Sequence, residues 1–506
     1  MTIAKLALDQ AGRVVVIDDQ LGTSTGAPFI AAQAYDSTYQ ALWVDTGAVA
    51  AADGRNNGLR FTTAGALRVY DATAGLPATT NTHLGMAMTT DGQVCITSGA
   101  STSPYVLNGV AMTNDGRVYV DILSFALEFA DLGAGVVSTV EAISGATPTF
   151  TRATAAWTKL STGLWAEVAS GNPRSFYSGL NTSVGSYLGY LAEGARTNSA
   201  LHGRLIAAGV AAAAWVESNV TAADDATGIG GVANSASTLT AGANDGTILQ
   251  SLTIASAAKT LSAFVRRKTG TGAVYITLDN DTTRTEITSS LNTGTYVRVS
   301  ATQTLANPVL GFKFATSGDA IEVDMVMLEN SASFASSPIP TTTLAVARNA
   351  DVLTYPTTGW FSATNGTMYE EVMPLTVVDS SCFMYGLSDA TTTNQLNFRR
   401  NTTSLQFYQR DGGASEDFTI SGVTVAVGTA IKMAGAYSSA VSSATTNGVS
   451  LSTGAGAFAA GAAVTTLSVG SLGGSASASM FAIKRLVYYA SRLPNAVLQA
   501  LTNGSR

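Results

Sequence analysis

The sequence predicts an all-β protein, and three observations lead to this fold class. Charged residues make up only 12% of the 506 residues, about half of the roughly 25% typical of soluble domains, and Gly is abundant. Stretches rich in Thr and Val suit strands better than exposed helices. Short runs that alternate apolar and polar residues recur between Gly, Asn and Asp. We therefore expect a repetitive β-hairpin platform at the N-terminus, then two jelly-roll or β-sandwich domains, with very little helix.

Four related stretches fill the first 125 residues, at intervals of roughly 25 residues or twice that. The clearest, GVAMTNDGRVYV at 109–120, places apolar residues on both sides of an Asp-Gly step. Glycine supplies the positive φ of a tight hairpin turn, so each copy predicts two antiparallel strands. One hairpin cannot bury its apolar face alone, so we expect 1–125 to serve attachment or oligomerisation. The other copies are GMAMTTDGQVCI at 85–96, GLRFTTAGALRV at 58–69 and LALDQAGRVVVI at 6–17, with room for an eroded copy near 35–49.

The remaining chain divides into three parts. Residues 126–200 are interpreted as a linker, and 122–131 could be a short helix or a linker strand. Residues 201–350 contain six short alternating runs between 247 and 328, which predict a β-sandwich. Residues 351–506 contain a second such series and end in a helix after Pro494, because proline is tolerated in a first helical turn.

The composition and the motifs argue against several classes of function. The net charge is −7 and no cluster of Lys and Arg is present, which argues against nucleic-acid binding. His83 and His202 lie in no catalytic or metal-binding motif, and Cys95 and Cys382 are interpreted as buried thiols. The most apolar window, 205–216, is too short to span a membrane. The N-terminal residues do not resemble a secretory signal, so we expect synthesis in the cytoplasm.

Acidic residues offer few pairs for catalysis. Glu370 and Glu371 are adjacent on a predicted strand and point to opposite faces, so they cannot flank one glycosidic bond. The other acidic pairs are Glu416 with Asp417 and Glu128 with Asp131. Acidic loops at 223–228 and 278–283 could hold calcium, but turn formation explains the same residues, and we expect no metal site.

Exposed aromatic rings are how sandwiches hold sugars, by stacking on a pyranose face. Filling of cores and interfaces explains most Trp and Tyr residues equally well. The candidate glycan-binding residues are Trp215, Trp360, Tyr385 and Tyr408, with Trp157 and Trp165 as weaker candidates.

Two stretches resemble a segment pattern of phage virion proteins. The first runs from 150 to 198 and the second from 329 to 351. In such proteins the first stretch leads into a jelly roll similar to carbohydrate-binding modules, and the second closes it. The matching residues are Phe150, Arg152, Thr154, Ala155, Gly163, Leu164, Pro173, Arg174, Leu191, Glu193, Ala195, Arg196, Thr197, Asn198, Glu329, Phe334, Ile339, Pro340, Thr341, Arg348, Ala350 and Asp351. The order PRSFY at 173–177 departs from the family's pattern by one serine.

The last 150 residues resemble a concanavalin-like or laminin-G-like sandwich. In that fold a Gly-Thr strand starts the domain, an Asn-Gly hairpin lies between central strands, and an inner strand ends in Y-Y-x-x-R-L. The matching positions are Gly366, Thr367, Asn447, Gly448, Tyr488, Tyr489, Arg492 and Leu493.

These resemblances imply a bacteriophage virion appendage, that is, a fibre, spike or decoration subunit. Its N-terminal region would dock on capsid, portal or tail proteins, and its sandwiches would project and contact host surface polysaccharide. We expect a homotrimer in the virion, without cofactor, nucleic acid or membrane insertion, and without enzymatic activity. A passive structural role remains open, and a polysaccharide-degrading tail spike is the alternative. A bacterial surface adhesin is disfavoured by the missing secretory signal.

Overall fold

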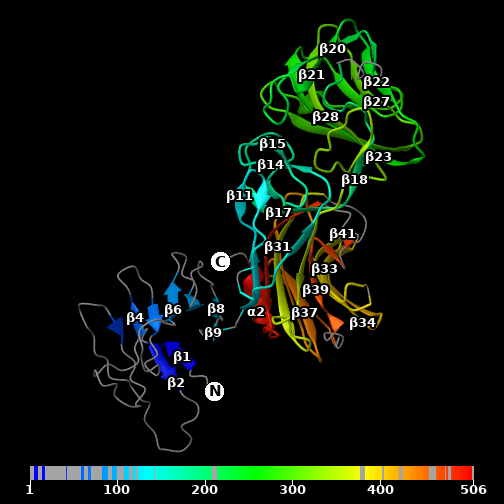
Figure 1. Cartoon of the computed structure of the whole chain (residues 1–506). Helices are drawn as coiled ribbons and strands as arrows, with labels where there is room; N and C mark the ends of the chain where they lie inside the picture. The colour runs from blue at the N-terminus through cyan, green and yellow to red at the C-terminus, as the bar shows by residue number, and fades with distance from the viewer. Residues whose placement is uncertain are drawn as a thin grey trace, which may run out of the picture.

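The fold is almost entirely β, which confirms the predicted fold class (Figure 1). The computed structural model describes nine strands before residue 121 by their backbone. Beyond them it describes residues 123–141, 143–207, 214–376, 382–391, 393–401, 404–420, 425–454, 458, 463–472, 475–476 and 480–503. In these parts no helix is long and apolar enough to cross a membrane.

Each of the four N-terminal repeats forms an antiparallel strand pair, as predicted. Val110 pairs with Val120 and Met112 with Val118, so the apolar residues that flank the Asp-Gly step lie opposite each other. The turn residues themselves, and most of the expected eroded copy at 35–49, lie outside the described residues. The pairs are β1 (Lys5–Leu8) with β2 (Val14–Ile17), β4 (Leu59–Phe61) with β5 (Leu67–Val69), β6 (His83–Met88) with β7 (Val94–Gly99), and β8 (Asn108–Met112) with β9 (Val118–Val120). With β3 (Ala41–Leu42), strands β4 to β9 form one seven-stranded sheet.

The sandwich expected at 201–350 is an insertion into the following domain, and we call it the inserted sandwich. The chain enters it through β18 (Arg196–Asn198) and leaves through β29 (Val346–Arg348), and these two strands pair antiparallel. Its core lies between two five-stranded faces. One consists of β20 (Val220–Ala226), β21 (Ala236–Ala241), β28 (Ala320–Asn330), β23 (Ala257–Thr269) and β26 (Val297–Leu305). The other consists of β19 (Val216–Ser218), β22 (Gly246–Ser251), β27 (Val309–Phe314), β24 (Val274–Thr277) and β25 (Arg284–Glu286).

The C-terminal sandwich is assembled from chain on both sides of the insertion. Its central strand β42 (Met480–Tyr489) pairs with β31 (Gly366–Pro374) along one edge. Along the other edge it pairs with β10 (Leu123–Glu128) and β17 (Tyr187–Glu193), which follow each other end to end. This sheet continues through β36 (Ile431–Tyr437), β37 (Ser442–Thr446) and β38 (Val449–Gly454), and through β16 (Ser175–Tyr177) at its other end. The facing sheet consists of β13 (Thr149–Thr151), β30 (Val352–Pro356), β39 (Thr466–Val469), β32 (Cys382–Ser388), β33 (Gln395–Asn401), β34 (Ser404–Asp411) and β35 (Ala414–Ile420).

Residues 126–200, expected to be a linker, are therefore part of these sheets. The stretch 122–131 contains the strand β10 rather than a helix, and Phe125 and Leu127 from it lie in the C-terminal core. The Asn447-Gly448 turn joins β37 to β38 with positive φ at both residues, as predicted, but at the edge of the sheet rather than between central strands. Helix α2 (Asn495–Thr502) begins directly after Pro494 and packs on the outer side of the sheet that contains β42.

A third apolar cluster joins the two sandwiches. Trp157 from β14 (Ala156–Lys159) and Trp165 from β15 (Trp165–Val168) pack against Phe264 of the inserted sandwich and Met480 of β42. This hairpin covers the outer side of the β20–β21–β28–β23–β26 face, so that face is used for contact within the chain.

Candidate functional site

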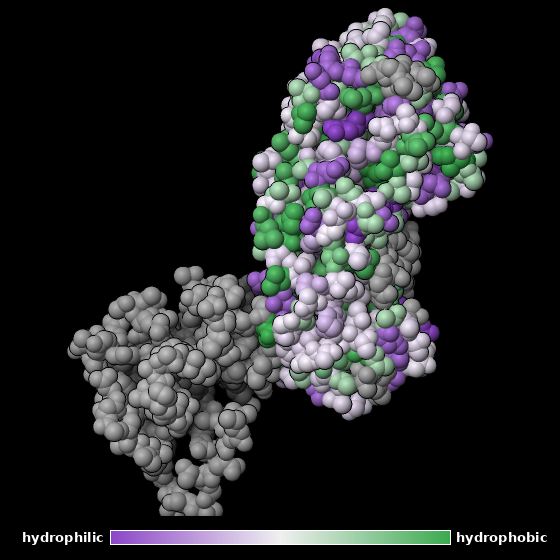
Figure 2. All heavy atoms as spheres, viewed as in Figure 1, coloured by the Kyte–Doolittle hydropathy of each residue, from purple (hydrophilic) through white to green (hydrophobic). Residues whose placement is uncertain are grey.

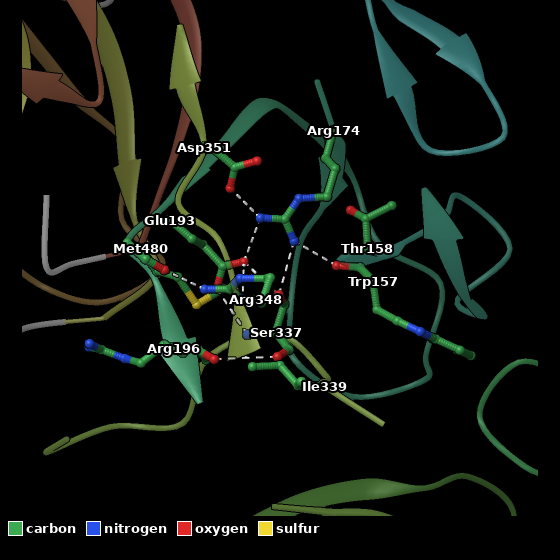
Figure 3. A network of polar contacts seen from close by, with 12 residues as sticks. Trp157, Thr158, Arg174, Glu193, Arg196, Ser337, Ile339, Arg348, Asp351 and Met480 are labelled. Atoms are coloured by element: carbon green, nitrogen blue, oxygen red, sulfur yellow. Dashed lines mark hydrogen bonds and ion pairs between the residues drawn. The ribbon is translucent and has the colours of Figure 1, made fainter. Parts of the chain in front are cut away.

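Five charged residues of the phage-like pattern, which lie far apart in the sequence, meet in one buried cluster between the sandwiches, and Figure 3 labels four of them. We call Arg152, Arg174, Glu193, Arg348 and Asp351 the arginine–carboxylate hub. They come from the chain before the insertion and from the chain after it, and all five side chains are at most 1% exposed.

Two carboxylates hold the three guanidinium groups of the hub. Asp351 accepts hydrogen bonds from Arg152, with 2.8 Å between Nη1 and Oδ1, and from Arg174. Glu193 Oε2 lies 2.7 Å from Arg174 Nη2 and 2.9 Å from Arg348 Nη1. Charge-assisted hydrogen bonds of this kind are about twice as strong as neutral ones. The hub therefore links the segment that leads into the inserted sandwich to the segment that leaves it.

Backbone groups satisfy much of the rest of the hub. Arg152 donates to the carbonyl oxygens of Thr154 and Ala169, and Arg348 donates to that of Gly194. Arg174 Nη1 lies 2.7 Å from the carbonyl oxygen of Trp157, so the hub also orients the hairpin that separates the sandwiches. These hydrogen bonds hold together segments that do not pair with one another as β-strands.

Ser337 completes the contacts of Glu193, and the phage-like pattern did not include this residue. Its backbone N–H donates to Glu193 Oε1 at 2.9 Å, and its hydroxyl donates to Oε2 at 2.5 Å. The Ser337 hydroxyl oxygen in turn accepts from Arg174 and Arg348. A single Ser among several in 331–337 carries no sequence signal that would single it out.

The electrostatics of the hub favour the charged forms of Glu193 and Arg174. Burial opposes ionisation of Glu193, but the attraction of Arg348 and Arg174 and the Ser337 hydrogen bonds outweigh it and lower its pKa to about 2. Burial likewise opposes the charge on Arg174, and the nearby Asp351 and Glu193 outweigh it, so the pKa of Arg174 is raised. Burial lowers the pKa of Arg152 and of Arg348, against the attraction of the neighbouring carboxylates. Because the hub is closed from solvent, it has no access for a substrate.

The Asn that ends the first stretch of the pattern has a structural role as well. The side-chain amide of Asn198 donates to the carbonyl oxygens of Val326 and Ile339, at 3.1 and 2.8 Å. Its amide oxygen accepts from the backbone N–H groups of Ala200 and Leu328, at 3.0 and 2.9 Å. Asn198 therefore closes the base of the inserted sandwich with four hydrogen bonds to backbone.

The aromatic residues expected to bind glycan are buried, and this corrects that expectation. Trp215 lies in the core of the inserted sandwich and donates to the carbonyl oxygen of Leu201. Trp360 and Tyr385 lie in the C-terminal core, and the guanidinium carbon of Arg399 lies 3.6 Å from the ring centroid of Tyr408. Alternation identifies a strand but does not say which of its faces meets the opposite sheet.

The predicted separation of Glu370 and Glu371 is confirmed. Glu370 points into the C-terminal core and is 0% exposed, whereas Glu371 lies on the other face with an ion pair to Lys484. Glu128 pairs with Arg485 across β10 and β42. The side chains of Glu416 and Asp417 lie outside the described residues.

Turn formation and ion pairing account for the acidic loops considered for calcium. Asp279 accepts from Thr283 and from Gln303 Nε2, while Asp281 pairs with Lys313 at 2.8 Å. Among the described residues, no group of three or more His, Cys, Asp or Glu side chains is placed to hold a metal ion. Cys382 is buried and outside any disulfide, as expected, whereas the side chains of His83 and Cys95 lie outside the described residues.

Sequence comparisons give no family, because no protein-family model and no curated protein matches the chain. Solved structures similar to parts of it include the CBM40 of the Ruminococcus gnavus IT-sialidase bound to alpha2,3 sialyllactose. That match has 14% identity and a TM-score of 0.24, and covers 28% of this chain and 84% of that one. The CBM22-1-CBM22-2 tandem domain of Paenibacillus barcinonensis Xyn10C matches with 8% identity and a TM-score of 0.21, over 60% of this chain and 99% of that one. A chain described as a receptor binding domain matches with 9% identity and a TM-score of 0.26, over 31% of this chain and 40% of its own length. At these TM-scores the similarity says nothing of what this chain binds.

Proposed function

We propose that the chain is a homotrimeric subunit of a bacteriophage virion appendage, and that its inserted sandwich contacts host surface glycan. The observation that carries the proposal is the insertion. Strand β10, which follows the N-terminal repeats, pairs inside the C-terminal sandwich, and the inserted sandwich lies beyond the hub at the far end (Figure 1). A molecule docked by its N-terminal region would therefore present the inserted sandwich outermost.

The phage-like pattern supports the same proposal through its chemistry. Five of its charged residues form the hub, and Asn198 closes the base of the inserted sandwich. The other two, Arg196 and Glu329, pair with each other, with 3.7 Å between Nε and Oε1. A set of residues that together close one structural joint is a more specific resemblance than the same letters scattered over unrelated loops.

One face of the inserted sandwich is available for a ligand. The face formed by β19, β22, β27, β24 and β25 carries Tyr275, Lys313 and Thr247 side by side on neighbouring strands, with Glu286 opposite Tyr275. Lys313 is paired with Asp245 and Asp281, and the guanidinium carbon of Arg284 lies 5.2 Å from the Tyr275 ring centroid. An amphipathic ring beside these charged groups and a hydroxyl offers a sugar both stacking and hydrogen bonds. We propose this row, in place of the four buried aromatic residues, as the glycan contact.

We further propose that the chain binds glycan without cleaving it. Hydrolysis needs two carboxyl groups on opposite sides of one bond. Among the acidic residues singled out in the sequence, Glu370 is enclosed, and Glu128 and Glu371 are held in ion pairs.

The proposal is tested with the purified full chain on an array of bacterial surface polysaccharides. We expect retention of at least one polysaccharide, a loss of at least tenfold in affinity with Tyr275→Ala, and no new reducing ends after incubation. Asn365→Ala, a change on the C-terminal sandwich, is the control and should bind like the wild type. A chain that binds no polysaccharide overturns the glycan contact, and new reducing ends would favour the depolymerase alternative.

A further inference from the structure

One side of the molecule exposes more aliphatic surface than its neighbours. Five side chains on it are exposed although they are large and apolar, and we call them the aliphatic flank. They are Leu132 at 66%, Val140 at 72%, Leu164 at 38%, Val184 at 76% and Val232 at 62% exposed. The hydrophobic surface beside β11 (Asp131–Gly133), β14 and β15 is visible along one edge of the middle of the molecule (Figures 1 and 2).

Contacts between the loops show that the flank is continuous. A side chain at Gly135, in the turn after Leu132, would meet Leu160 Cδ2 at 3.3 Å, so the β11 hairpin lies on the β14–β15 hairpin. Gly163 lies against the backbone of Thr182, which brings Leu164 near Val184. Gly231 in turn lies against the Leu164 side chain, which places Val232 at the same end. The flank therefore runs from the C-terminal sandwich across the junction to the inserted sandwich.

The flank is also poor in charge. Residues 129–187 contain six ionisable residues of the Asp, Glu, Lys and Arg types, and Glu141, Arg152, Lys159 and Arg174 are buried. The exposed remainder is Asp131, which accepts from Tyr177, and Glu167. The stretch 129–187 thus exposes no cation and only two acids, and offers little charge pattern for a charged partner to match.

We propose that the aliphatic flank is the contact surface between copies of this chain. The inference rests on the homo-oligomer of the proposed function and names its surface. Around the three-fold axis of a trimer the flanks of the three copies converge, so like charges must be scarce there, and this stretch meets that condition. An exposed aliphatic stripe that crosses two sandwiches is larger than the isolated apolar residues usual on monomers. Packing through the flank would align the copies lengthwise, with every inserted sandwich at the same end.

The test uses the full chain with charges placed in the flank. Leu164→Glu combined with Val184→Glu should weaken self-association at least a hundredfold, measured by sedimentation velocity over a range of concentrations. Val427→Glu alters an equally exposed valine, at 55%, on the C-terminal sandwich and should leave the association unchanged. Circular dichroism should be the same for all three proteins, because the altered side chains are exposed.

A photo-crosslinking residue in place of Val184 tests directly whether the flank contacts a second copy. We expect a covalent product of two copies upon illumination, with the crosslink mapped to 129–187 or 232 of the second copy. A crosslink within one chain, or unchanged association of the double variant, overturns the proposal and assigns the flank to another segment. A wild-type chain that stays monomeric overturns it together with the homo-oligomer, whereas the polysaccharide array reports on the glycan contact independently.

Discussion

Glu370 is a carboxyl group enclosed in the apolar core of the C-terminal sandwich. It lies on β31 between Met368 and Val372, which also face the core. Neither carboxyl oxygen has a hydrogen-bond partner among the described residues, and the same holds for the hydroxyl of Tyr385, which is near enough to interact with it electrostatically. Burial alone raises the pKa of Glu370 well above its ordinary value of 4.5. The folded protein therefore holds this group as a neutral acid.

A neutral acid in the folded state makes stability depend on pH in a definite direction. Above the ordinary pKa the unfolded chain releases the Glu370 proton while the folded chain keeps it. Each further pH unit then lowers the free energy of unfolding by about 1.4 kcal/mol. The decline continues over the pH range in which the folded chain keeps the proton. The contribution is favourable at low pH and is lost as the pH rises, opposite to the behaviour of a paired carboxylate.

Glu370→Gln removes the ionisable carboxyl group while preserving the size of the side chain. We expect the free energy of unfolding of the variant to lack this decline. The stability of the variant relative to the wild type should therefore increase as the pH rises. Hydrogen exchange of the β31 and β36 amides reports the stability of this sandwich specifically. Glu371→Gln, one residue away on the opposite face, is the matched control and should run parallel to the wild type. Parallel curves for Glu370→Gln would show that the carboxyl is ionised or paired in the fold, and would refute the reasoning.

Three further substitutions and one control test the joint and the sheets by urea unfolding. Arg174→Met leaves two carboxylates buried without their central cation and should cost about 3–5 kcal/mol; a loss below about 1 kcal/mol would contradict a closed hub. Asn198→Ala removes four hydrogen bonds and should cost at least about 3 kcal/mol, and a near-neutral result would mean that other groups replace the amide. Gly189→Ala should cost about 2 kcal/mol or more, because φ is 117° and a Cβ would lie 2.1 Å from the Ile483 carbonyl oxygen. Gly412→Ala, with positive φ but nothing within 4 Å, should cost clearly less.

Much of the fold was predictable because it depends on local patterns. The runs 259–267 and 321–328 lie within β23 and β28, since side chains that point to opposite faces in turn are a property of strands. The hairpin at Asn447-Gly448 was predictable because both residues adopt positive φ at little cost.

The pairing of distant strands was not predictable in this way. Nothing in the run 123–128 indicates that its partner is β42, more than 350 residues later, and without that pairing 126–200 resembles a linker. The burial of Trp360 has the same origin. Its ring contacts Phe125, with 4.5 Å between the ring centroids, and that neighbour arrives only through β10. The candidate site was therefore misplaced wherever it depended on long-range pairing.

The hub explains why its charged positions are more restricted in residue type than the apolar core positions. Many apolar residues can fill a sandwich core at similar cost, so core positions such as Leu328 tolerate substitution and carry little signal. A buried Arg174 must keep a carboxylate partner at hydrogen-bond distance, because a lone charge would cost several kcal/mol. Loss of either the arginine or its carboxylate partner therefore lowers stability strongly. Replacing both, together with their neighbours, requires several simultaneous substitutions. The same coupling keeps β18 beside β29 whatever loops the inserted sandwich carries, so the outer surface of that sandwich is free to change while the joint stays constant.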